Sequence, residues 1–250
     1  YLGIALVMRS GRSLVLTEEG RIYAYQIRQA LGEIAGVTEK FLARSNFPQL
    51  TLSVLPSYAM HWLLPRLHGF MSAHPGLRLK LESTMAFAGL EQGLVNCAIR
   101  FGHGQWPDMH CETLMSDSLL VVAARDFNHG VLPDTPHAIL EQPLLHASES
   151  WATWLCAAGV EGQRPHASLE FTDSTLLLEA VRLGHGVALT RRSIAHSLIQ
   201  RGELVKLTDI EPAHSSSYYL VWPLGIKRSA QLTSLHSWLK DQVVAYQDSL

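Results

Sequence analysis

Residues 51–65 of the chain read TLSVLPSYAMHWLLP, and this stretch decides how the rest of the sequence is interpreted. The residues before Pro56 form a short apolar run that favours a β-strand, and a helical apolar pattern follows from Ser57. A helix that begins at the carboxyl end of a strand presents free N–H groups and its positive dipole end to the space above the sheet. Ser57 is therefore either a plain N-cap or a hydroxyl that contacts a ligand, and both interpretations stay open here.

Length and composition describe a globular protein with one large or two smaller domains. The chain has 250 residues, of which 47% are hydrophobic and 17% charged, with a formal net charge of −2 and a pI of about 6.7. Any nucleic-acid-binding role must therefore sit in a local patch. We expect neither a membrane span nor a signal peptide. Cys97, Cys111 and Cys156 form no CxxC pair, which predicts reduced thiols in the cytoplasm.

The first residues predict a hairpin with a basic tip. Residues 5–8 and 13–16 are short β-compatible runs on either side of RSGR, which begins at Arg9 and ends at Arg12. An ordinary solvated turn explains the same pattern, so the hairpin alone does not establish a DNA contact. Because the apolar pattern starts without any helix signal, we also expect part of the natural protein to precede Tyr1.

A long helix is predicted next, over residues 18–44. Thr17 is a suitable N-cap, and Glu18 and Glu19 place carboxylates in the first turn, where the helix dipole favours them. At about 1.5 Å per residue such a helix is about 40 Å long. Its apolar positions recur at spacings of three, four and seven on a narrow stripe, which suits pairing with a second copy of the chain. A surface helix that lies on its own domain is the alternative.

From residue 49 onward, predicted strands and helices alternate in two rounds. This alternation predicts parallel sheets with crossover helices in two α/β lobes. Lobe I is expected to comprise residues 49–122 and 218–250, and lobe II residues 123–217. Residues 119–124 and 217–222 are the expected crossing strands between the lobes.

The sequence also predicts three local features of this region. The apolar pattern predicts one regular helix over residues 58–73. Residues 112–114 and 119–124 are expected to be separate strands. Residues 184–186 (GHG) are expected to form a helix-to-strand turn that needs small residues.

Polar residues gather at the expected strand ends, where ligands of such architectures bind between lobes. Hydroxyls, helix N-termini and an arginine suit a small anionic or zwitterionic ligand. The candidate ligand-binding residues are Ser57, Tyr58, Ser83, Thr84, Arg100, Phe101, His146, Thr172, Asp173, Ser174 and Thr190. Structural alternatives remain for most of them, such as a loop hydroxyl for Ser83 and Thr84, an N-cap for Asp173 and an internal ion pair for Arg100.

Catalytic and cofactor motifs are missing from the sequence. Ser57 lies in LPSYA rather than in a G-x-S-x-G turn, and no His or Asp can be assigned to it by spacing. The 13 histidines form no H-E-x-x-H motif and no cluster with cysteines, so no metal site is expected. There is no Walker A loop, and residues 184–186 are not a dinucleotide fingerprint, so we expect no cofactor.

Several motifs resemble one family of proteins. Residues 2–20, LGIALVMRSGRSLVLTEEG, look like the wing and the start of the linker helix of LysR-type transcriptional regulators. The motifs SVLPSYAMHWLLPRL from Ser53, AIRFGHGQWP from Ala98, PLLH from Pro143 and GHGVALTRR from Gly184 resemble that family as well. The closest subgroup is that of glycine-cleavage and β-lactamase gene activators, and the resemblance covers nearly the whole chain.

This resemblance implies a domain organisation. Residues 1–16 would be the remnant of a winged helix-turn-helix DNA-binding domain, with Arg9 and Arg12 as DNA contacts. Residues 17–46 would be the linker and dimerisation helix, followed by a two-lobe periplasmic-binding-protein-like effector domain without catalysis. Within that domain Ser57, Ser83, Thr84, Arg100 and Ser174 match positions of the effector cleft.

The sequence departs from the family pattern in two places. The recognition helix-turn-helix expected before Leu2 is not part of this chain. Gly89 and Asn96 stand where the subgroup is expected to have acidic residues, so the effectors of the relatives are not carried over.

The sequence therefore predicts an α/β protein that is a ligand-responsive bacterial DNA-binding transcriptional regulator and not an enzyme. Its expected partners are DNA, a small anionic or zwitterionic effector and further copies of itself in a homodimer or homotetramer, without membrane contact. A solute-binding protein with the same two-lobe plan and no DNA role is the alternative. The hairpin and long helix over residues 2–41 count against that alternative.

Overall fold

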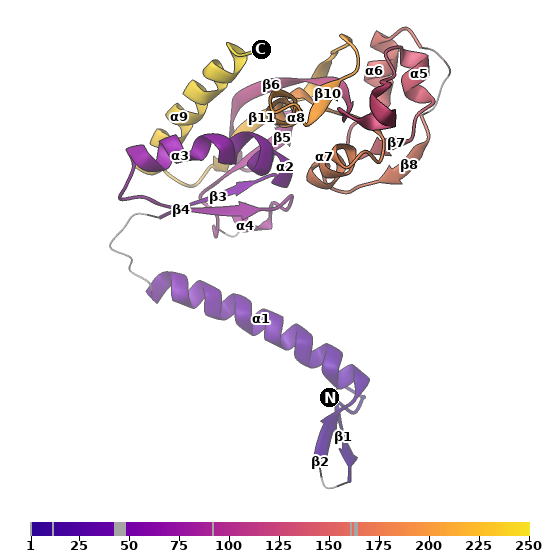
Figure 1. The fold of residues 1–250 in the computed structure, drawn as a ribbon. Coiled ribbons are helices and arrows are strands. Elements are labelled where there is room, and N and C mark those ends of the chain that lie inside the picture. Colours follow the sequence, from indigo (N-terminus) through magenta and orange to yellow (C-terminus); the bar gives the residue numbers. More distant parts are fainter. Residues whose placement is uncertain (1, 12, 43–48, 92, 161, 163–164) are drawn as a thin grey trace. The chain divides into compact units, whose positions relative to one another are not determined.

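The chain divides into two compact units. The computed structural model describes residues 2–11, 13–42, 49–91, 93–160, 162 and 165–250 (Figure 1). The N-terminal unit comprises residues 1–46 and the C-terminal unit residues 47–250. No helix in these described ranges is long and apolar enough to cross a membrane.

The N-terminal unit consists of a hairpin and one helix. Strands β1 (Val7–Ser10) and β2 (Ser13–Leu16) pair antiparallel, and helix α1 (Glu18–Leu42) follows. Thr17 caps this helix as predicted, because its Oγ1 accepts the amide of Gly20 at 2.9 Å. The same hydroxyl donates to the carbonyl of Ala5 at 2.8 Å, which joins the helix to the start of the hairpin. The hairpin and helix are thus present, while their roles as wing and linker stay predictions.

Two of the expectations for this unit fall outside the described residues. Arg12, the second basic residue of the hairpin tip, is one of them. The predicted end of the helix at residues 43 and 44 is the other. The described part of α1 keeps its apolar stripe exposed, since Ile27, Leu31 and Ile34 are 42%, 58% and 62% accessible.

The C-terminal unit is built on a mixed sheet. Its strand order is β4-β3-β5-β11-β6-β9-β7-β8, and β10 also pairs with β6. The strands are β3 (Gln49–Val54), β4 (Arg78–Ser83), β5 (Cys97–Gly102), β6 (Met109–Ala124), β7 (Leu144–His146), β8 (Ala167–Glu170), β9 (Val187–Arg191), β10 (Leu204–Lys206) and β11 (Ala213–Pro223). The predicted parallel pairing occurs within the groups β4-β3-β5 and β9-β7-β8, whereas β6 and β11 run antiparallel to their neighbours.

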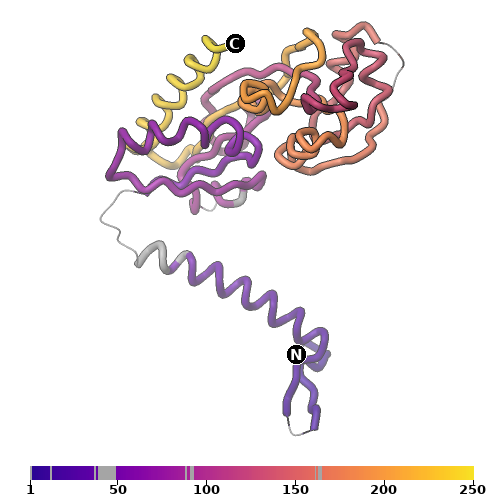
Figure 2. Tube along the Cα trace, in the orientation of Figure 1, coloured from indigo at the N-terminus to yellow at the C-terminus, as the bar shows by residue number. Residues whose placement is uncertain are grey.

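Helices cover the two ends of this sheet. They are α2 (Pro56–Tyr58), the π-helix η1 (Ala59–Leu63), α3 (Leu64–Ala73), α4 (Ala88–Glu91), the 3-10 helix η2 (Phe127–Gly130), α5 (Pro136–Leu140), α6 (Trp151–Ala157), α7 (Ser174–Arg182), α8 (Arg192–Gln200) and α9 (Ala230–Gln247). We call β3, β4, β5, β11 and their helices α2 to α4 and α9 lobe I. We call β7 to β10 with α5 to α8 lobe II. Within the C-terminal unit, Figure 2 shows the purple segments and the yellow α9 in lobe I, and the pink segments that include α5 and α6 in lobe II.

Each lobe has its own hydrophobic core. Tyr58, Trp62 and Tyr218 are fully buried in the core of lobe I, where α9 contributes Leu235 and Leu239. Lobe II has one cluster around Trp154 and another around Leu177 and Ile194. Separate cores allow the lobes to keep their internal packing when their relative angle changes. The predicted residue limits of the lobes stay a prediction.

Strand β6 is longer than the sequence suggested. The expectation of separate strands at residues 112–114 and 119–124 is wrong, because β6 is continuous over 16 residues. Residues 109–118 pair with β11, and residues 119–124 pair with β9 and β10 of lobe II. Continuous pairing overrides the polar residues 116–118 that interrupt the apolar pattern. Strand β6 therefore belongs to both lobes.

The helix after β3 also differs from its prediction. It begins at Pro56, which occupies the first helical position, and Leu55 is the N-cap without any side-chain hydrogen bond. Ser57 is consequently not an N-cap, because proline suits the first helical position and moves the start of the helix forward. The predicted regular helix contains the π-helical turn η1 instead, a feature that often marks functional regions.

We predict that the exposed stripe of α1 pairs with a second copy of the chain. Leu31→Lys should weaken dimerisation measured by analytical ultracentrifugation, because it places a charge in the apolar stripe. Gln29→Lys is the matched control, since the 3.6-residue period puts position 29 on the opposite face of α1. Equal dissociation constants for the two variants would place the dimer contact elsewhere.

Candidate functional site

A cleft lies between the two lobes. Its volume is about 180 Å³, and its lining residues are Leu55, Pro56, Ser57, Met85, Phe101, Ser148, Thr172, Asp173, Ser174 and Arg191. The first five belong to lobe I and its loops, and the last five to lobe II and its loops. Because both lobes supply walls, a molecule in this cleft would contact both of them at once.

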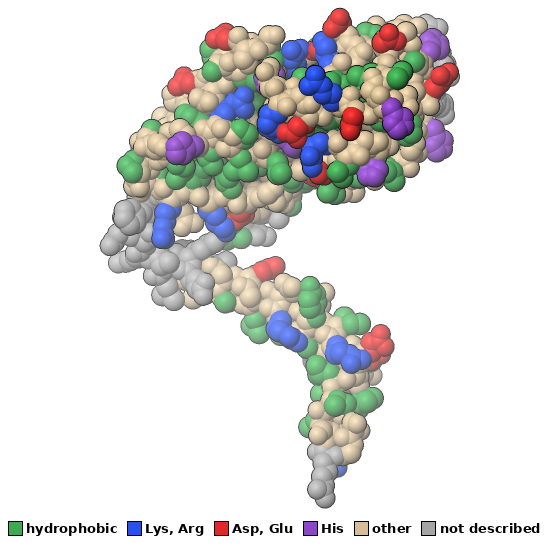
Figure 3. Space-filling view, in the orientation of Figure 1, with side chains coloured by type: hydrophobic (Ala, Val, Ile, Leu, Met, Phe, Trp, Pro, Cys, Tyr) green, Lys and Arg blue, Asp and Glu red, His purple; other side chains and the backbone are tan. Residues whose placement is uncertain are grey.

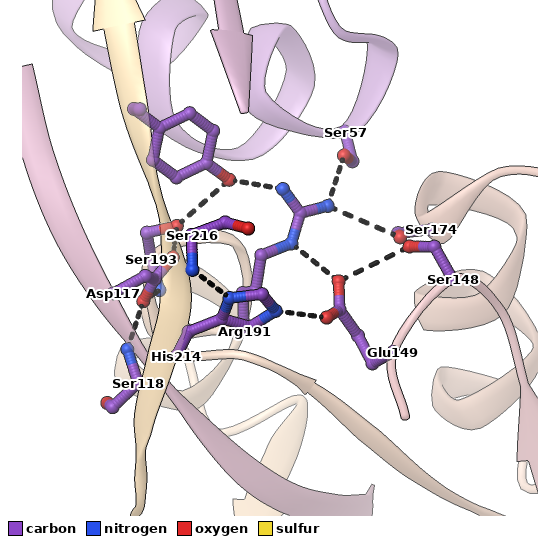
Figure 4. Close-up of polar contacts among 11 residues, drawn as sticks. Ser57, Asp117, Ser118, Ser148, Glu149, Ser174, Arg191, Ser193, His214 and Ser216 are labelled. Carbon is purple, nitrogen blue, oxygen red and sulfur yellow. Dashed lines mark hydrogen bonds and ion pairs between the residues drawn. The ribbon is translucent and has the colours of Figure 1, made fainter. Parts of the chain in front are cut away.

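Arg191 occupies the centre of the cleft, at the end of β9. Its side chain is almost fully buried, and Nη1 donates to the Tyr218 hydroxyl at 2.7 Å (Figure 4). Nη2 points to the hydroxyls of Ser57 at 3.4 Å and Ser174 at 3.5 Å. One guanidinium thus touches a serine from each lobe and a tyrosine on β11 of lobe I.

Glu149 supplies the countercharge for this buried arginine. Its Oε1 lies 2.9 Å from Arg191 Nε, and its Oε2 lies 2.8 Å from His214 Nε2. His214 Nδ1 accepts the amide of Ser216 at 2.8 Å, so the imidazole proton is on Nε2 and is donated to Glu149. The guanidinium also lies 4.6 Å from the centre of the Phe101 ring, which shields the ion pair from water.

The pKa shifts of this pair favour the charged forms. Burial by itself raises the pKa of Glu149, but the hydrogen bond from His214 and the charge of Arg191 outweigh it and hold that pKa below its usual value. Burial lowers the pKa of Arg191, yet interactions with Tyr218 and Glu149 raise it above its usual value. Both side chains are therefore ionised in the folded protein.

A second polar chain fixes Tyr218 from the other side. Asp117 on β6 accepts the amide of Ser193 at 3.1 Å, its hydroxyl at 2.5 Å and the amide of Ser118 at 2.9 Å. The Ser193 hydroxyl lies 3.4 Å from that of Tyr218. The dashed lines in Figure 4 run from Asp117 and Ser193 to the hydroxyl of an unlabelled aromatic ring and from there to Arg191. Residues of β6, α8 and β11 thus fix the position of the arginine.

Two helix N-termini face the cleft. Ser57 lies in the first turn of α2, and Ser174 is the first residue of α7. Asp173 caps α7 as predicted, because its Oδ1 accepts the Thr175 amide at 2.7 Å. Since α2 has no side-chain cap, its first-turn amides and positive dipole end remain available to an anion.

The structure brings together part of the predicted set. Ser57, Phe101, Thr172, Asp173 and Ser174 line the cleft. Tyr58 instead packs in the core between Trp62 and Tyr218, with ring centroids 4.9 and 4.3 Å away.

The other predicted residues lie away from this lining. Arg100 donates to Ser53 Oγ and to the Ala86 carbonyl, both at 2.7 Å, and burial lowers its pKa to about 10. Thr190 is fully buried, His146 stacks near Trp151, and Thr84 Oγ1 accepts the Ala86 amide. Ser83 lines a neighbouring cavity.

This neighbouring cavity is larger and apolar. It measures about 470 Å³, and its lining includes Met60, Leu64, Leu81 and Leu176. It shares Pro56 and Asp173 with the cleft. Figure 3 shows apolar side chains gathered on the visible face of the C-terminal unit.

Sequence reasoning missed the residues at the centre of the network. Arg191 directly follows the candidate Thr190, but Glu149 and His214 stand alone in polar stretches and form no spaced motif. Only the register of β9 with β6 and the path of β11 bring them together. Within the described ranges, no three His, Cys, Asp or Glu side chains form a group that could hold a metal ion.

We predict that the charge of Arg191 depends on Glu149. Glu149→Ala should lower the free energy of unfolding near neutral pH by about 3–5 kcal/mol, because it leaves a buried guanidinium without a countercharge. Glu141→Ala, at an exposed carboxylate, should change it by less than about 0.5 kcal/mol. Urea denaturation of both variants measures the difference.

The pH dependence of this effect has a defined sign. The pKa of Glu149 is lower in the folded protein than in the unfolded chain, so its ionised form stabilises the folded protein. This stabilisation is fully present above the unfolded-state pKa of about 4.3, and it is lost as the pH falls through the folded-state pKa. The difference in the free energy of unfolding between wild type and Glu149→Ala should therefore become smaller as the pH falls. A gap that stays constant or widens would contradict this assignment.

Comparisons with known proteins agree with this architecture. The family of the LysR substrate binding domain matches residues 43–244. The glycine cleavage system transcriptional activator of Escherichia coli (strain K12) is 32% identical over 251 residues, covering 99% of this chain and 82% of that protein. The HTH-type transcriptional activator AmpR of Pseudomonas aeruginosa is 28% identical over 246 residues, covering 95% of this chain and 80% of that protein.

Solved structures show the same fold. The effector domain of AmpR of Pseudomonas aeruginosa has a TM-score of 0.72 at 24% identity, covering 81% of this chain and 98% of that chain. CrgA, a LysR-type transcriptional regulator from Neisseria meningitidis, has a TM-score of 0.64 at 22% identity, covering 98% of this chain and 84% of that chain. These relatives are transcription regulators rather than enzymes, and the predicted family and α/β fold class are confirmed. The chain belongs to the LysR family, and it is a ligand-responsive transcriptional regulator whose C-terminal unit is the effector-binding domain.

Proposed function

We propose that a small anionic or zwitterionic effector binds in the cleft and changes the angle between the lobes. The observation that carries this proposal is that Arg191 contacts Ser57 of lobe I and Ser174 of lobe II from the floor of the cleft. A ligand that replaces these contacts touches both lobes, so its affinity differs between a conformation with the lobes open and one with the lobes closed. Such differential affinity is what shifts a population of conformations.

The chemistry of the walls supports this ligand class. The first turn of α2 offers uncapped amides and the hydroxyl of Ser57, which suit an anionic group. At the opposite wall, Asp173 uses one carboxylate oxygen to cap α7, which leaves the other as an acceptor for a positively charged group of a zwitterion.

The output of the regulator is DNA binding in the cytoplasm by an oligomer. Arg9 is exposed on β1, and no acidic residue precedes Glu18, so the hairpin has a local positive charge. A basic hairpin suits contacts with phosphates or the minor groove, which position a protein and carry little base information. Helix α1 joins two copies in a homodimer, or in a homotetramer of two such pairs.

We predict that Ser57 contributes to effector affinity. Ser57→Ala should weaken binding of an effector found by thermal-shift screening by about 1 kcal/mol, the scale of one lost hydrogen bond. Ser150→Ala is the matched control, because Ser150 caps α6 outside the cleft and should change stability without changing affinity. Calorimetric titration measures the effector affinity of both variants. Equal affinities for wild type and Ser57→Ala would show that Ser57 is not part of the site.

A further prediction concerns Arg9 in the full-length protein. Arg9→Ala should weaken DNA binding similarly for specific and random sequences, and it should reduce the salt dependence by about one phosphate contact. Filter-binding titrations at several salt concentrations measure both quantities. A loss confined to the specific sequence would instead make Arg9 a base-reading residue.

A further inference from the structure

We propose that the effector is a small monocarboxylate and that Arg191 is the residue that binds its carboxylate. This inference rests on the proposed function of the cleft and narrows its ligand class. Its first support is an unused pair of donors. Ser57 and Ser174 are 3% and 7% exposed, and each hydroxyl oxygen accepts from Arg191 Nη2. Each hydroxyl keeps its own proton, and neither finds an acceptor among the described residues.

The backbone of α2 adds further donors at the same wall. Helix α2 continues directly into η1 and α3, so residues 56–73 form one helical stretch with a developed dipole. Pro56 has no N–H, and the first amide that is bonded within the helix is that of Ala59, which donates to Leu55. The amides of Ser57 and Tyr58 therefore lie in an uncapped first turn beside the Ser57 hydroxyl. Hydroxyls and amides of this kind need an acceptor oxygen.

Arg191 can bind such an oxygen without losing its own support. Its contacts to Ser57 and Ser174 are 3.4 and 3.5 Å long, at the weak limit of hydrogen bonding. Its contact to Tyr218 is 2.7 Å and its ion pair with Glu149 is 2.9 Å. A carboxylate would thus replace two weak bonds at Nη2 by a charge-assisted one, while Nη1 and Nε keep the guanidinium in place.

Size and charge restrict the ligand to a small molecule with a single carboxylate. A cleft of about 180 Å³ is smaller than the 300–1,000 Å³ that is common for sites of drug-sized ligands. Glu149 already neutralises Arg191, and Asp173 adds a negative charge at the far wall. A doubly charged phosphate would be repelled by these carboxylates, whereas a neutral carbonyl would form weaker bonds with the same donors.

Pairs of acids and amides of the same shape test this inference on the full chain. Acetate, propionate, benzoate and glycine are each compared with the corresponding primary amide by calorimetry at matched ionic strength. At least one acid should bind about tenfold or more tightly than its amide, because only the acid offers a charged acceptor to Arg191. Amides that bind as tightly as the acids would overturn the inference, and so would a panel in which every acid binds more weakly than about 10 mM.

Two double variants assign the preference to Arg191. Arg191→Met with Glu149→Gln removes the ion pair without leaving a buried charge, and it should abolish the preference for acids. The control is Arg192→Met with Glu211→Gln, which removes a neighbouring ion pair that does not line the cleft and should keep the preference. If the first variant keeps the preference or the control loses it, Arg191 is not the carboxylate-binding residue.

The same experiment separates this inference from the proposed function. Ser57→Trp fills the cleft and serves as a blocked protein. A ligand without a carboxylate that binds wild type but not Ser57→Trp would preserve the effector cleft and overturn the carboxylate assignment. An acid that binds both proteins equally would place its site elsewhere and overturn both.

Discussion

A positive charge buried where two lobes meet is the constraint on which this site depends. Moving a guanidinium out of water costs several kcal/mol unless a countercharge and hydrogen bonds replace its hydration. Arg191 obtains them from Glu149, Tyr218 and, more weakly, from Ser57 and Ser174. These partners lie in separate segments of the chain, and Ser57 is 134 positions away from the arginine. The charge is therefore tolerated only when lobe I, with its strand β11, and lobe II come together.

One irregularity in the pairing of β6 with β11 supplies both supports of this arrangement. Ala213 pairs with Ser118 and Ser217 with Ser116, so the segment between Ala213 and Ser217 lies opposite Asp117 alone. Within this bulge His214 binds Glu149, and across from it Asp117 binds Ser193 beside Tyr218. Bulges commonly redirect side chains next to functional sites. Here a bulge provides polar partners on both sides of the arginine without interrupting β6 or β11.

The sequence allowed the order of elements and the strand-end region of the site to be predicted, but not its centre. Strand β3 and the Asp173 cap are encoded by neighbouring residues, and each is found where local patterns place it. The helix after β3 is present as well, but it begins at Pro56 and contains a π-helical turn that the local pattern did not predict. Arg191 was missed although its neighbour Thr190 was named. Successive residues of a strand point to opposite faces of the sheet, so an error of one residue selects the side chain that faces away from the cleft. Likewise Phe101 lines the cleft, whereas Arg100 binds Ser53 on β3. Pairing of Glu149 with Arg191 depends on tertiary contacts, for which a single sequence carries no periodic signal.

The unequal strength of the contacts around Arg191 explains how a small ligand could influence the lobes. The short bond to Tyr218 connects the arginine to β11 of lobe I, and the ion pair with Glu149 fixes it to lobe II. The contacts with the cleft walls at Ser57 and Ser174 are long, so little free energy is lost when a ligand replaces them. A ligand changes an equilibrium only by the difference between its affinities for the two states. Because Ser57 moves with lobe I and Ser174 with lobe II, a ligand that bridges both serines has a binding free energy that depends on the lobe angle.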